Sequence, residues 1–376
     1  MLSNRMSMAT SAASVNHRSV EYTVDEPLKR THSSFVATDM ASPAVLLVIP
    51  TLNEAANIGR VIAALDAGYH FDGRSRIVVV DGGSTDATRN VVCDLMQTIP
   101  CLQLLHNPKR IQSAAINLAV RKFGHDMDVL IRCDAHAEYP PEFVSRLLAK
   151  LQQTGSDAVV VPMDSVGQQC FSRGVAWLSD SVVGSGGAAH RGGDKQGYVD
   201  HGHHAAFRLE TFRIIGGYDE SFHCNEDAEL DCRQRAIGAT IYLDGSNRIR
   251  YQPRSNLKAL WRQYFGYGMG RSRTMRRHPH SIRLRQLAVP AHFILSLICL
   301  LGAYWIPALL IWPLVYLCML GLNGGLIMLR HRSWCALGAV PAAITMHLAW
   351  SLGFFRELLR VRERRWVPAM IESLTP

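Results

Sequence analysis

Short apolar runs alternate with segments of helical periodicity between residues 44 and 161. Residues 45–49 and 77–80 are continuous apolar runs, as expected of parallel strands that are buried on both faces. Residues between them repeat with the spacing of one helix face, at Ile58, Val61, Ile62 and Leu65. The pattern continues with helices predicted at 87–95, 113–123 and 142–153 and strands at 102–106, 129–132 and 158–161. This alternation predicts an α/β fold, a parallel sheet wrapped by helices.

Polar side chains collect where the predicted strands end. They are Asn53, Glu54, Asp81, Asn107 and Asp134. In open α/β sheets ligands bind beyond the carboxyl ends of the strands, so these side chains outline one pocket. The chain contains neither a GxGxxG nor a Walker phosphate loop, which argues against dinucleotide enzymes and kinases.

The apolar character rises sharply after residue 286. The chain as a whole is 48% apolar and 19% charged, but residues 287–355 are almost uncharged. The segments 287–305, 306–329 and 333–355 each have the ~20 residues that a membrane span needs, which predicts two or three transmembrane helices. Three spans would place residues 356–376 opposite the α/β domain. That arrangement opposes the positive-inside tendency, so a re-entrant segment is the alternative.

The net charge of +9 is concentrated on both sides of the apolar region. Arginines precede it at Arg271, Arg273, Arg276, Arg277, Arg283 and Arg285 and follow it at Arg356, Arg360, Arg362, Arg364 and Arg365. Such clusters favour anionic lipid headgroups over nucleic acid, which requires a basic face on a soluble domain.

The remaining segments complete the predicted organisation. The start of the chain is rich in Ser, Ala and Thr and lacks an apolar signal core, which predicts a disordered tail. Residues 257–268 have helical amphipathic spacing, typical of an interfacial helix or of a helix packed on the core, and the Gly-rich residues 184–197 predict a mobile loop. Nine cysteines without a CxxC pair predict reduced, packed thiols. The predicted parts are a tail (1–43), an α/β domain (44–250), a basic amphipathic segment (251–286), a membrane region (287–355) and a basic tail (356–376).

Six sequence strings carry a family resemblance. PTLNE at 50–54 and DGGSTD at 81–86 are each compatible with ordinary turns. Together with NPKRIQSAAINLA, RCDAH, GGYDE and NEDAELDCR, in order over about 44–263, they resemble the inverting family-2 glycosyltransferases of the GT-A fold. Within that family the chain is most similar to bacterial enzymes that build exopolysaccharides such as succinoglycan. The resemblance implies a nucleotide-binding sheet with an acceptor subdomain, followed here by C-terminal transmembrane helices.

The resemblance also implies a donor site. Its nucleotide-sugar residues would be Pro50, Asn53, Glu54, Asp81, Lys109, Arg110 and Asp134. Among these, Asp81 would accept a hydrogen bond from the uracil ring N–H. Asp134 and His136 stand where the family has Asp-x-Asp, so they would hold a divalent cation, Mn²⁺ or Mg²⁺, that neutralises the departing diphosphate. The structural alternative for Asp134 is a strand-end carboxylate that caps a turn.

The same resemblance assigns the reaction and the acceptor side. Asp227 would be the general base, with Glu226 as the next candidate, and a single base implies inversion at the anomeric carbon. The alternative is a solvated, acidic helix start. The predicted acceptor residues are His203, His204, Gln263 and Arg271. A zinc site that uses the neighbouring histidines is the other interpretation, although HxHH is not a known ligand spacing. The QxxRW string of processive members is not intact, so repeated addition is not expected.

We therefore expect a multi-pass protein of the bacterial inner membrane with a cytoplasmic catalytic domain. It would transfer a hexose, glucose from UDP-glucose, to an oligosaccharide on polyprenyl diphosphate in exopolysaccharide biosynthesis. One alternative is a polyprenyl-phosphate sugar synthase, and another is an inactive membrane scaffold. The expected partners are the UDP-sugar, the lipid-linked acceptor, the membrane and other polysaccharide-assembly enzymes, and no nucleic acid.

Overall fold

The computed structural model describes residues 42–71, 73–187 and 195–367. The predicted N-terminal tail lies outside these residues except for its last two positions. The centre of the Gly-rich segment and residues 368–376 of the basic tail also lie outside them.

An eight-stranded sheet forms the α/β domain, in the order β3-β2-β1-β4-β8-β5-β9-β7. Strands β1 to β4 are parallel to one another, and β8 runs antiparallel to both β4 and β5. A separate parallel pair joins β10 to β6. The strands are β1 (Val45–Thr51), β2 (Arg76–Asp81), β3 (Leu102–His106), β4 (Val129–Arg132), β5 (Ala158–Val161), β6 (Met163–Ser165), β7 (Gly197–Tyr198), β8 (His203–Arg208), β9 (Ile241–Leu243) and β10 (Ile249–Tyr251).

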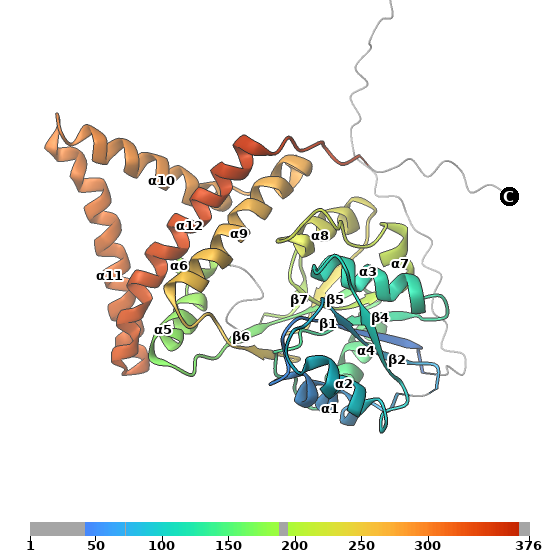
Figure 1. The fold of residues 1–376 in the computed structure, drawn as a ribbon. Helices are drawn as coiled ribbons and strands as arrows, with labels where there is room; N and C mark the ends of the chain where they lie inside the picture. The colour runs from blue at the N-terminus through green and yellow to red at the C-terminus, as the bar shows by residue number, and fades with distance from the viewer. Residues whose placement is uncertain (1–41, 72, 188–194, 368–376) are drawn as a thin grey trace, which may run out of the picture. The chain divides into compact units, whose positions relative to one another are not determined.

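Helices cover both faces of this sheet, with α1, α2 and α4 on one face and α3, α7 and α8 on the other (Figure 1). Strand β1 contributes to two apolar cores, Leu47 and Ile49 to one and Leu46 and Val48 to the other. Burial on both faces explains why its sequence is apolar without alternation. The helices of the domain are α1 (Ile58–Ala67), α2 (Thr88–Leu95), α3 (Gln112–Phe123), α4 (Phe143–Thr154), α5 (Cys170–Ser179), α6 (Val182–Ser185), α7 (Leu209–Ile214) and α8 (Glu226–Ala236).

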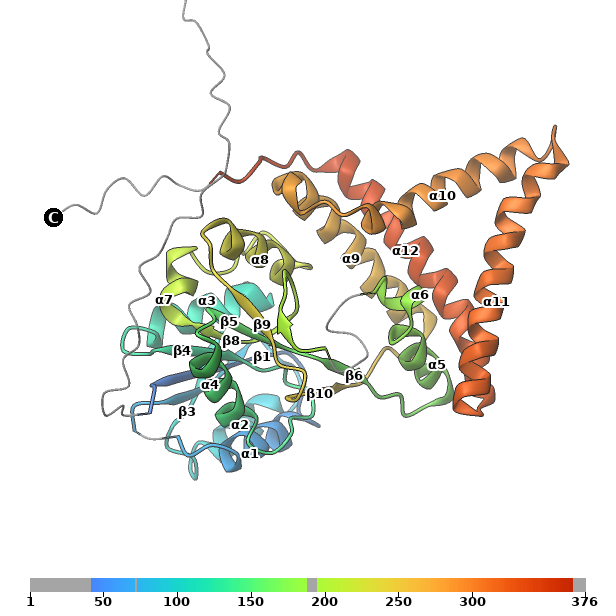
Figure 2. The same cartoon turned by 180° about the vertical axis from the view of Figure 1, so that it is seen from behind.

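Four long helices follow the sheet. They are α9 (Leu257–Arg277), α10 (Leu284–Gly302), α11 (Ile311–His331) and α12 (Ala339–Arg360), with short 3-10 turns η1 (Pro279–Ser281), η2 (Pro307–Leu310) and η3 (Trp334–Gly338) between them. Helices α9 and α12 lie side by side in both views, whereas α10 and α11 extend away from them (Figures 1 and 2). Three segments are long and apolar enough to cross a membrane: Leu284–Gly302, Pro307–His331 and Trp334–Arg360.

Helix α9 is longer than its amphipathic pattern indicates, and glycines allow it to pack closely against α12. A side chain at Gly268 would overlap the backbone of Trp350, and one at Gly353 would overlap the backbone of Phe265. The two helices therefore approach at backbone contact, which only residues without a Cβ allow. Of the two interpretations of this segment, packing accounts for Leu260, which is 1% exposed, whereas Leu257 and Trp261 remain at the surface.

The cysteine prediction is wrong for one pair. Cys170, at the start of α5, and Cys335, in η3, form a disulfide across 165 residues of sequence. No local spacing signals this pair, because the two residues meet only when η3 packs against α5. The other seven cysteines are free, as expected.

Candidate active site

Two turns at the carboxyl ends of β1 and β2 brace each other. The backbone N–H of Asn53 donates to Ser84 Oγ at 2.8 Å, and the N–H of Thr85 donates to Asn53 Oδ1 at 2.8 Å. Asn53 has φ 55°, a left-handed conformation that Asn tolerates better than most residues. The carboxylate of Asp81 accepts the N–H of Ser84 at 3.0 Å and that of Gly83 at 3.1 Å. These bonds give the donor side of the sheet a fixed rim.

Glu54 is bonded to His136. Its Oε1 lies 3.0 Å from His136 Nδ1, and its Oε2 accepts from Asn57 Nδ2 at 2.9 Å. Burial alone would raise the pKa of Glu54, but the hydrogen bonds from His136 and Asn57 outweigh it and the pKa is lowered. The hydrogen bond to Glu54 in turn raises the pKa of His136. A histidine whose Nδ1 faces a carboxylate presents Nε2 to a metal, the arrangement typical of metal-bound histidine.

Asp134 lies next to two histidines and an arginine. Its Oδ2 is 3.5 Å from His203 Nε2, and its Oδ1 is 3.5 Å from Arg132 Nη2. Burial opposes ionisation of Asp134, but the positive charge of Arg132 and then His203 lowers its pKa. Its backbone N–H donates to Tyr139 Oη at 2.5 Å, which holds the end of β4 in place.

The donor atoms of Asp134 and His136, a carboxylate and an imidazole, fit Mn²⁺ or Mg²⁺ bound in part by phosphate oxygens. Within residues 42–71, 73–187 and 195–367, no three His, Cys, Asp or Glu side chains converge closely enough to hold an ion alone. The ion would therefore need ligands from the bound nucleotide. This is consistent with a cation that arrives with its diphosphate.

Glu226 and Asp227 occupy the first turn of α8, after Asn225 in a left-handed conformation. Asp227 Oδ1 accepts from Arg132 Nη1 at 2.6 Å and from Tyr218 Oη at 2.8 Å. Burial opposes ionisation of Asp227, but Arg132 outweighs it and lowers the pKa well below its usual range. Burial, and then the charge of Asp227, raise the pKa of Glu226 to about 7. Two adjacent carboxyl groups thus differ strongly in their readiness to hold a proton.

One cavity of about 1210 Å³ joins these groups to the C-terminal helices. Asp134, His136, Glu226 and Asp227 line it on the side of the α/β domain. The opposite side combines arginines with apolar and aromatic side chains, and its lining includes Gln263, Tyr267, Arg271, Arg283, Arg285, Val289, Met346 and Trp350. The carboxylates therefore face a space that continues to the helices.

Known proteins are similar to this chain in sequence and in fold. Residues 46–215 match the sequence profile described as glycosyl transferase family 2. The succinoglycan biosynthesis protein ExoA of Rhizobium meliloti (strain 1021) is 41% identical over 329 residues, which are 87% of this chain and 98% of that relative. The chain belongs to glycosyl transferase family 2. It is a glycosyltransferase, as its six strings predict.

Two more distant proteins are also similar to this chain, one in sequence and one in fold. A dolichyl N-acetyl-alpha-D-glucosaminyl phosphate 3-beta-D-2,3-diacetamido-2,3-dideoxy-beta-D-glucuronosyltransferase of Methanococcus voltae is 22% identical over 84% of this chain and 97% of its own length. The solved mannosyltransferase PcManGT from Pyrobaculum calidifontis, in complex with GDP-Man and Mn²⁺, superposes with a TM-score of 0.53 at 19% identity. That superposition covers 82% of this chain and 88% of the mannosyltransferase. The GT-A prediction for the α/β domain is thereby confirmed.

The structure brings together part of the predicted family 2 site. Besides Asp134, His136, Glu226 and Asp227, the cavity wall includes the predicted acceptor residues His203, Gln263 and Arg271. His204 does not belong with them, and its acceptor prediction is wrong. It is fully buried and bonded to Asp231. Successive side chains of a strand point to opposite faces, so β8 cannot present both His203 and His204 to the cavity.

The predicted nucleotide residues form a neighbouring group outside the cavity lining. Asn53 and Asp81 shape the turns, and Lys109 Nζ pairs with Glu220 Oε2 at 2.5 Å. Arg110 has φ 57° at the turn before α3, and Pro50 lies within β1. The roles predicted for these residues in binding the nucleotide stay predictions.

Sequence reasoning missed Arg132 and Tyr218. Arg132 contacts both Asp134 and Asp227, so it connects the predicted metal ligand to the predicted base. A signal was present, because Arg132 is a charged residue at the end of an apolar strand, where burial requires a partner. Tyr218 carries no such signal, since its hydroxyl meets Asp227 only in the folded chain.

Proposed function

We propose that this glycosyltransferase is an inverting, membrane-anchored hexosyltransferase of exopolysaccharide biosynthesis. It transfers glucose from UDP-glucose to an oligosaccharide carried on polyprenyl diphosphate. The observation that carries the proposal is the single cavity with carboxylates at one side and arginines and apolar side chains at the other. The relative from Rhizobium meliloti, a succinoglycan biosynthesis protein, supports the polysaccharide context.

On the donor side, the ends of β1 to β4 bind the nucleotide. Asp134 and His136 would hold a divalent cation together with the diphosphate, and Glu54 orients the His136 ring through the 3.0 Å hydrogen bond. The cation supplies the positive charge that stabilises the departing nucleoside diphosphate. The GDP-Man and Mn²⁺ bound in the mannosyltransferase structure support this choice of ligand class.

On the acceptor side, Asp227 accepts the proton of the attacking hydroxyl. The hydroxyl oxygen bonds to the anomeric carbon as the bond from that carbon to the diphosphate breaks, and attack from the opposite face inverts the configuration. Arg132 and Tyr218 hold the Asp227 carboxylate in place. Glu226, with a pKa raised to about 7, is the alternative base, because a general base works best when its pKa is near the ambient pH.

The lipid end of the acceptor lies toward the helices. Arg271, Arg283 and Arg285 line that side, and guanidinium groups match phosphate oxygens in charge and geometry. Val289, Met346 and Trp350 supply apolar surface beside them. The predicted parts at 44–250, 251–286 and 287–355 would thus act as catalytic domain, acceptor-binding segment and anchor. The catalytic domain is placed on the cytoplasmic face of the inner membrane, together with other polysaccharide-assembly enzymes.

A panel of labelled nucleotide sugars tests the proposal. Membranes that contain the full chain are incubated with each sugar and with either an extracted diphosphate-linked oligosaccharide or plain polyprenyl phosphate. We expect label from UDP-glucose on the diphosphate-linked acceptor in a β-linkage, determined by linkage analysis. Transfer to plain polyprenyl phosphate would instead identify a polyprenyl-phosphate sugar synthase. The absence of transfer from every sugar would support the alternative of an inactive membrane scaffold.

The same assay tests the cation through a matched pair of variants. Asp134→Ala should lose transfer, whereas Asp126→Ala, at an exposed position before the same strand, should retain it. Full transfer by Asp134→Ala in the presence of a chelator would contradict the assignment of the metal.

A further inference from the structure

Helix α12 differs from the other two helices that are long enough to span a membrane. In its most apolar window 39% of the residues are buried within the chain, against 11% for α10 and 17% for Pro307–His331. A lipid-facing helix can stay exposed, but a helix that packs against its own protein along its length has another role. The contacts at its start, middle and end identify that role.

The start of α12 is attached to the α/β domain. It follows η3, where Cys335 is bonded to Cys170 of α5. A Cβ on Gly174 of α5 would lie 2.6 Å from the carbonyl oxygen of Cys335, so the two segments are in backbone contact. Helix α5 follows directly from β6 of the α/β domain. The first turn of α12 therefore lies against a helix that only four residues, 166–169, separate from β6.

The middle of α12 contacts α6 and faces the cavity that the α/β domain also lines. His347 Nε2 lies 3.1 Å from the carbonyl oxygen of Val183 in α6. Met346 and Trp350 line the same cavity as Asp134 and Asp227. On its other side, Gly353 packs on the backbone of Phe265 in α9. A helix that leaves the domain to cross a bilayer would lose these contacts by its midpoint.

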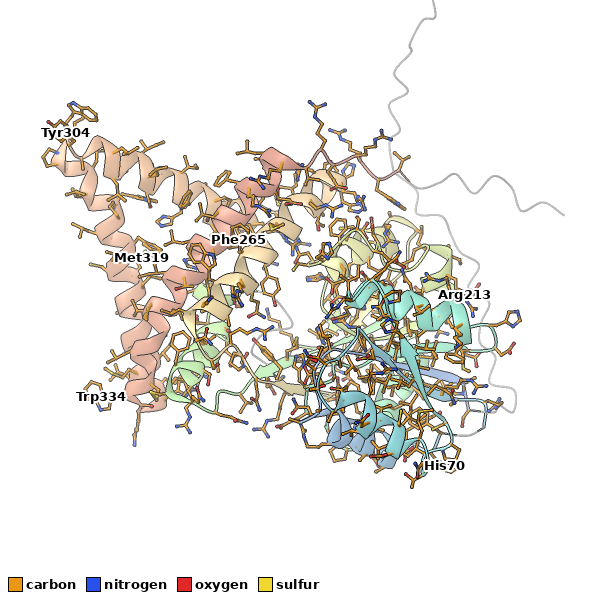
Figure 3. The ribbon with its side chains drawn as sticks, in the orientation of Figure 1. His70, Arg213, Phe265, Tyr304, Met319 and Trp334 are labelled. Atoms are coloured by element: carbon orange, nitrogen blue, oxygen red, sulfur yellow. A yellow bond between two sulfur atoms is a disulfide. The ribbon has the colours of Figure 1, made fainter. Side chains whose placement is uncertain are left out.

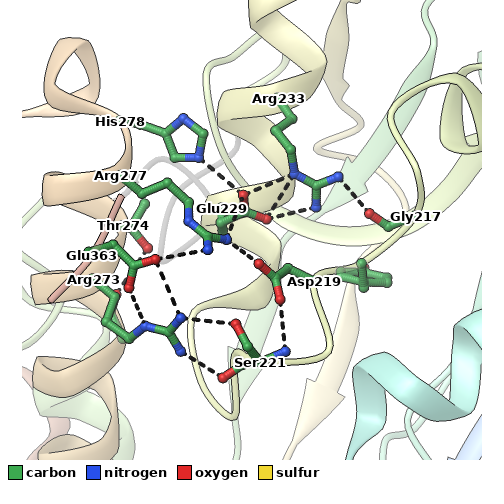
Figure 4. Close-up of polar contacts among 12 residues, drawn as sticks. Gly217, Asp219, Ser221, Glu229, Arg233, Arg273, Thr274, Arg277, His278 and Glu363 are labelled. Carbon is green, nitrogen blue, oxygen red and sulfur yellow. Dashed lines mark hydrogen bonds and ion pairs between the residues drawn. The ribbon is translucent and has the colours of Figure 1, made fainter. Parts of the chain in front are cut away.

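The chain after α12 returns to the domain as well, as Figure 4 shows. Glu363 pairs with Arg273 at 2.7 Å and with Arg277 at 2.8 Å, and its side chain is 4% exposed. Arg277 in turn pairs with Asp219, and Arg273 donates to the carbonyl oxygen of Ser221 at 2.6 Å. The N–H of Trp366 donates to the carbonyl oxygen of Arg277 at 3.0 Å. The start of α12 is thus held at α5, and the segment after its end is held at α9 and, through Arg273 and Arg277, at Ser221 and Asp219 of the α/β domain.

Helices α10 and α11, in contrast, are buried within the chain over only a small part of their length. The start of α10 is held by Arg285, which donates to the carbonyl oxygens of Gly186 and Gly187, and the end of α11 by His331, stacked on Trp177 of α5. Between these points the chain carries no Asp, Glu, Lys or Arg from residue 286 to residue 329. The turn between the helices exposes Tyr304 (86%) and Trp305 (76%), and Tyr304 lies at its tip in Figure 3. Aromatic residues of this kind favour the membrane interface.

We infer that, among the described residues, the α10–α11 hairpin is the segment that crosses the bilayer, and that α12 stays on the catalytic side. Helices of 19 and 21 residues are about 30 Å long, enough for the hydrocarbon core. Helix α12 lies along α9 and presents Leu348, Leu352 and Leu359 to the headgroup region. Two crossings return the chain to its starting side, so the arginines at 356–365 join those at 271–285, as the positive-inside tendency requires.

Sidedness of three epitope tags in the full-length chain tests this inference. One tag precedes Met1, one follows Pro376, and one is inserted between Ala303 and Tyr304, each in a separate protein. Antibody binding is measured in sealed vesicles of each orientation, with detergent-opened vesicles as the control for total tag. We expect the N- and C-terminal tags on the same side and the tip tag on the opposite side.

Each other pattern overturns the inference. N- and C-terminal tags on opposite sides would mean that α12 crosses, and a tip tag on the same side as both termini would mean that the hairpin does not cross. The readout needs no turnover, so it stays independent of the proposed reaction. Thermal melting in detergent shows whether each tagged protein is folded, and only proteins that melt at the temperature of the untagged chain are scored.

Discussion

The donor side of the α/β domain and the helical side of the cavity are held together by different forces. On the donor side, turns after β1 and β2 are tied by short hydrogen bonds between Asn53, Ser84 and Thr85, on a sheet buried on both faces. On the helical side, ion pairs such as Arg277 with Glu363 connect segments far apart in the sequence. Arg132, at the end of β4 in the α/β domain, contacts both Asp134 and Asp227. In the proposed function the donor side binds the nucleotide sugar, and the helical side connects the reacting groups to the membrane helices.

The largest expected effect is that of Asp227→Asn, which should lower turnover without changing donor binding. Asp227→Asn should lower turnover by the ~10² to 10⁴ fold that positioned proton transfer supplies, because an amide cannot accept the proton. UDP-sugar affinity should stay close to that of the wild type, since the carboxylate belongs to the acceptor side. Turnover is measured with saturating donor, and affinity by titration calorimetry.

Asp227→Asn also removes the carboxylate that Arg132 and Tyr218 contact, so a loss of folding could be mistaken for a loss of catalysis. Thermal melting of Asp227→Asn serves as the control for folding, together with Asp126→Asn at an exposed position. A variant that lost donor affinity but kept its rate would remove Asp227 as the base and favour Glu226.

The next effect concerns the donor side alone. Glu54→Gln should weaken divalent-ion binding by ~10 to 100 fold, the usual effect of losing the partner that orients a metal-bound histidine. The amide no longer fixes which nitrogen of His136 carries the proton. Mn²⁺ binding in the presence of UDP is measured by electron paramagnetic resonance, with Glu142→Gln, an exposed carboxylate, as the control. Unchanged Mn²⁺ affinity would contradict a metal role for His136.

The pH dependence of turnover should report the ionisation of Glu226. Burial raises its pKa from 4.5 to about 7, so ionisation above that pH adds a negative charge beside Asp227 and increases its basicity. Turnover should therefore rise severalfold through about pH 7, and Glu226→Gln should remove this rise while retaining activity. A variant without activity would instead make Glu226 the base.

The stability of the protein should report the ionisation of Glu226 independently of turnover. A raised folded-state pKa contributes stability that is complete below the unfolded value of 4.5 and is lost as the pH rises through about 7. Thermal melting between pH 5 and pH 8 should thus decline more for the wild type than for Glu226→Gln. Equal slopes would contradict the buried, protonated state.

Most of the donor side could be predicted from the sequence, for a physical reason. Strands β1, β2 and β4 are buried on both faces, so each is a short apolar run whose polar successor lies at the sheet edge. This pattern predicts the positions of Asp81, at the end of β2, and of Asp134, just after β4. Strand β8 was missed because its His203 and His204 interrupt the apolar pattern, although it pairs with β4 and β5 in the middle of the sheet.

The helical side could be predicted only in outline. Apolar length indicated α12 as a span, but the same side chains pack on α9, and hydropathy does not distinguish lipid from protein as the apolar neighbour. The pairing of Gly268 with Trp350 and of Cys170 with Cys335 joins residues 82 and 165 positions apart, and no local pattern records such distances.

The smallest effect on the reaction should come from Glu363, which holds the end of α12 on α9. Glu363→Gln removes the charge that faces Arg273 and Arg277, and hydrogen bonds to charged groups contribute about 1.5 to 3 kcal/mol. Both arginines keep other partners, Ser221 and Asp219, so the loss should be near the lower value. We expect a lower melting temperature in detergent and unchanged turnover at 25 °C, with the exposed Arg364→Gln as the control. A loss of turnover without a loss of stability would mean that the end of α12 acts on the acceptor directly. The helical side would then take part in the reaction itself, and its ion pairs would do more than hold α12 in place.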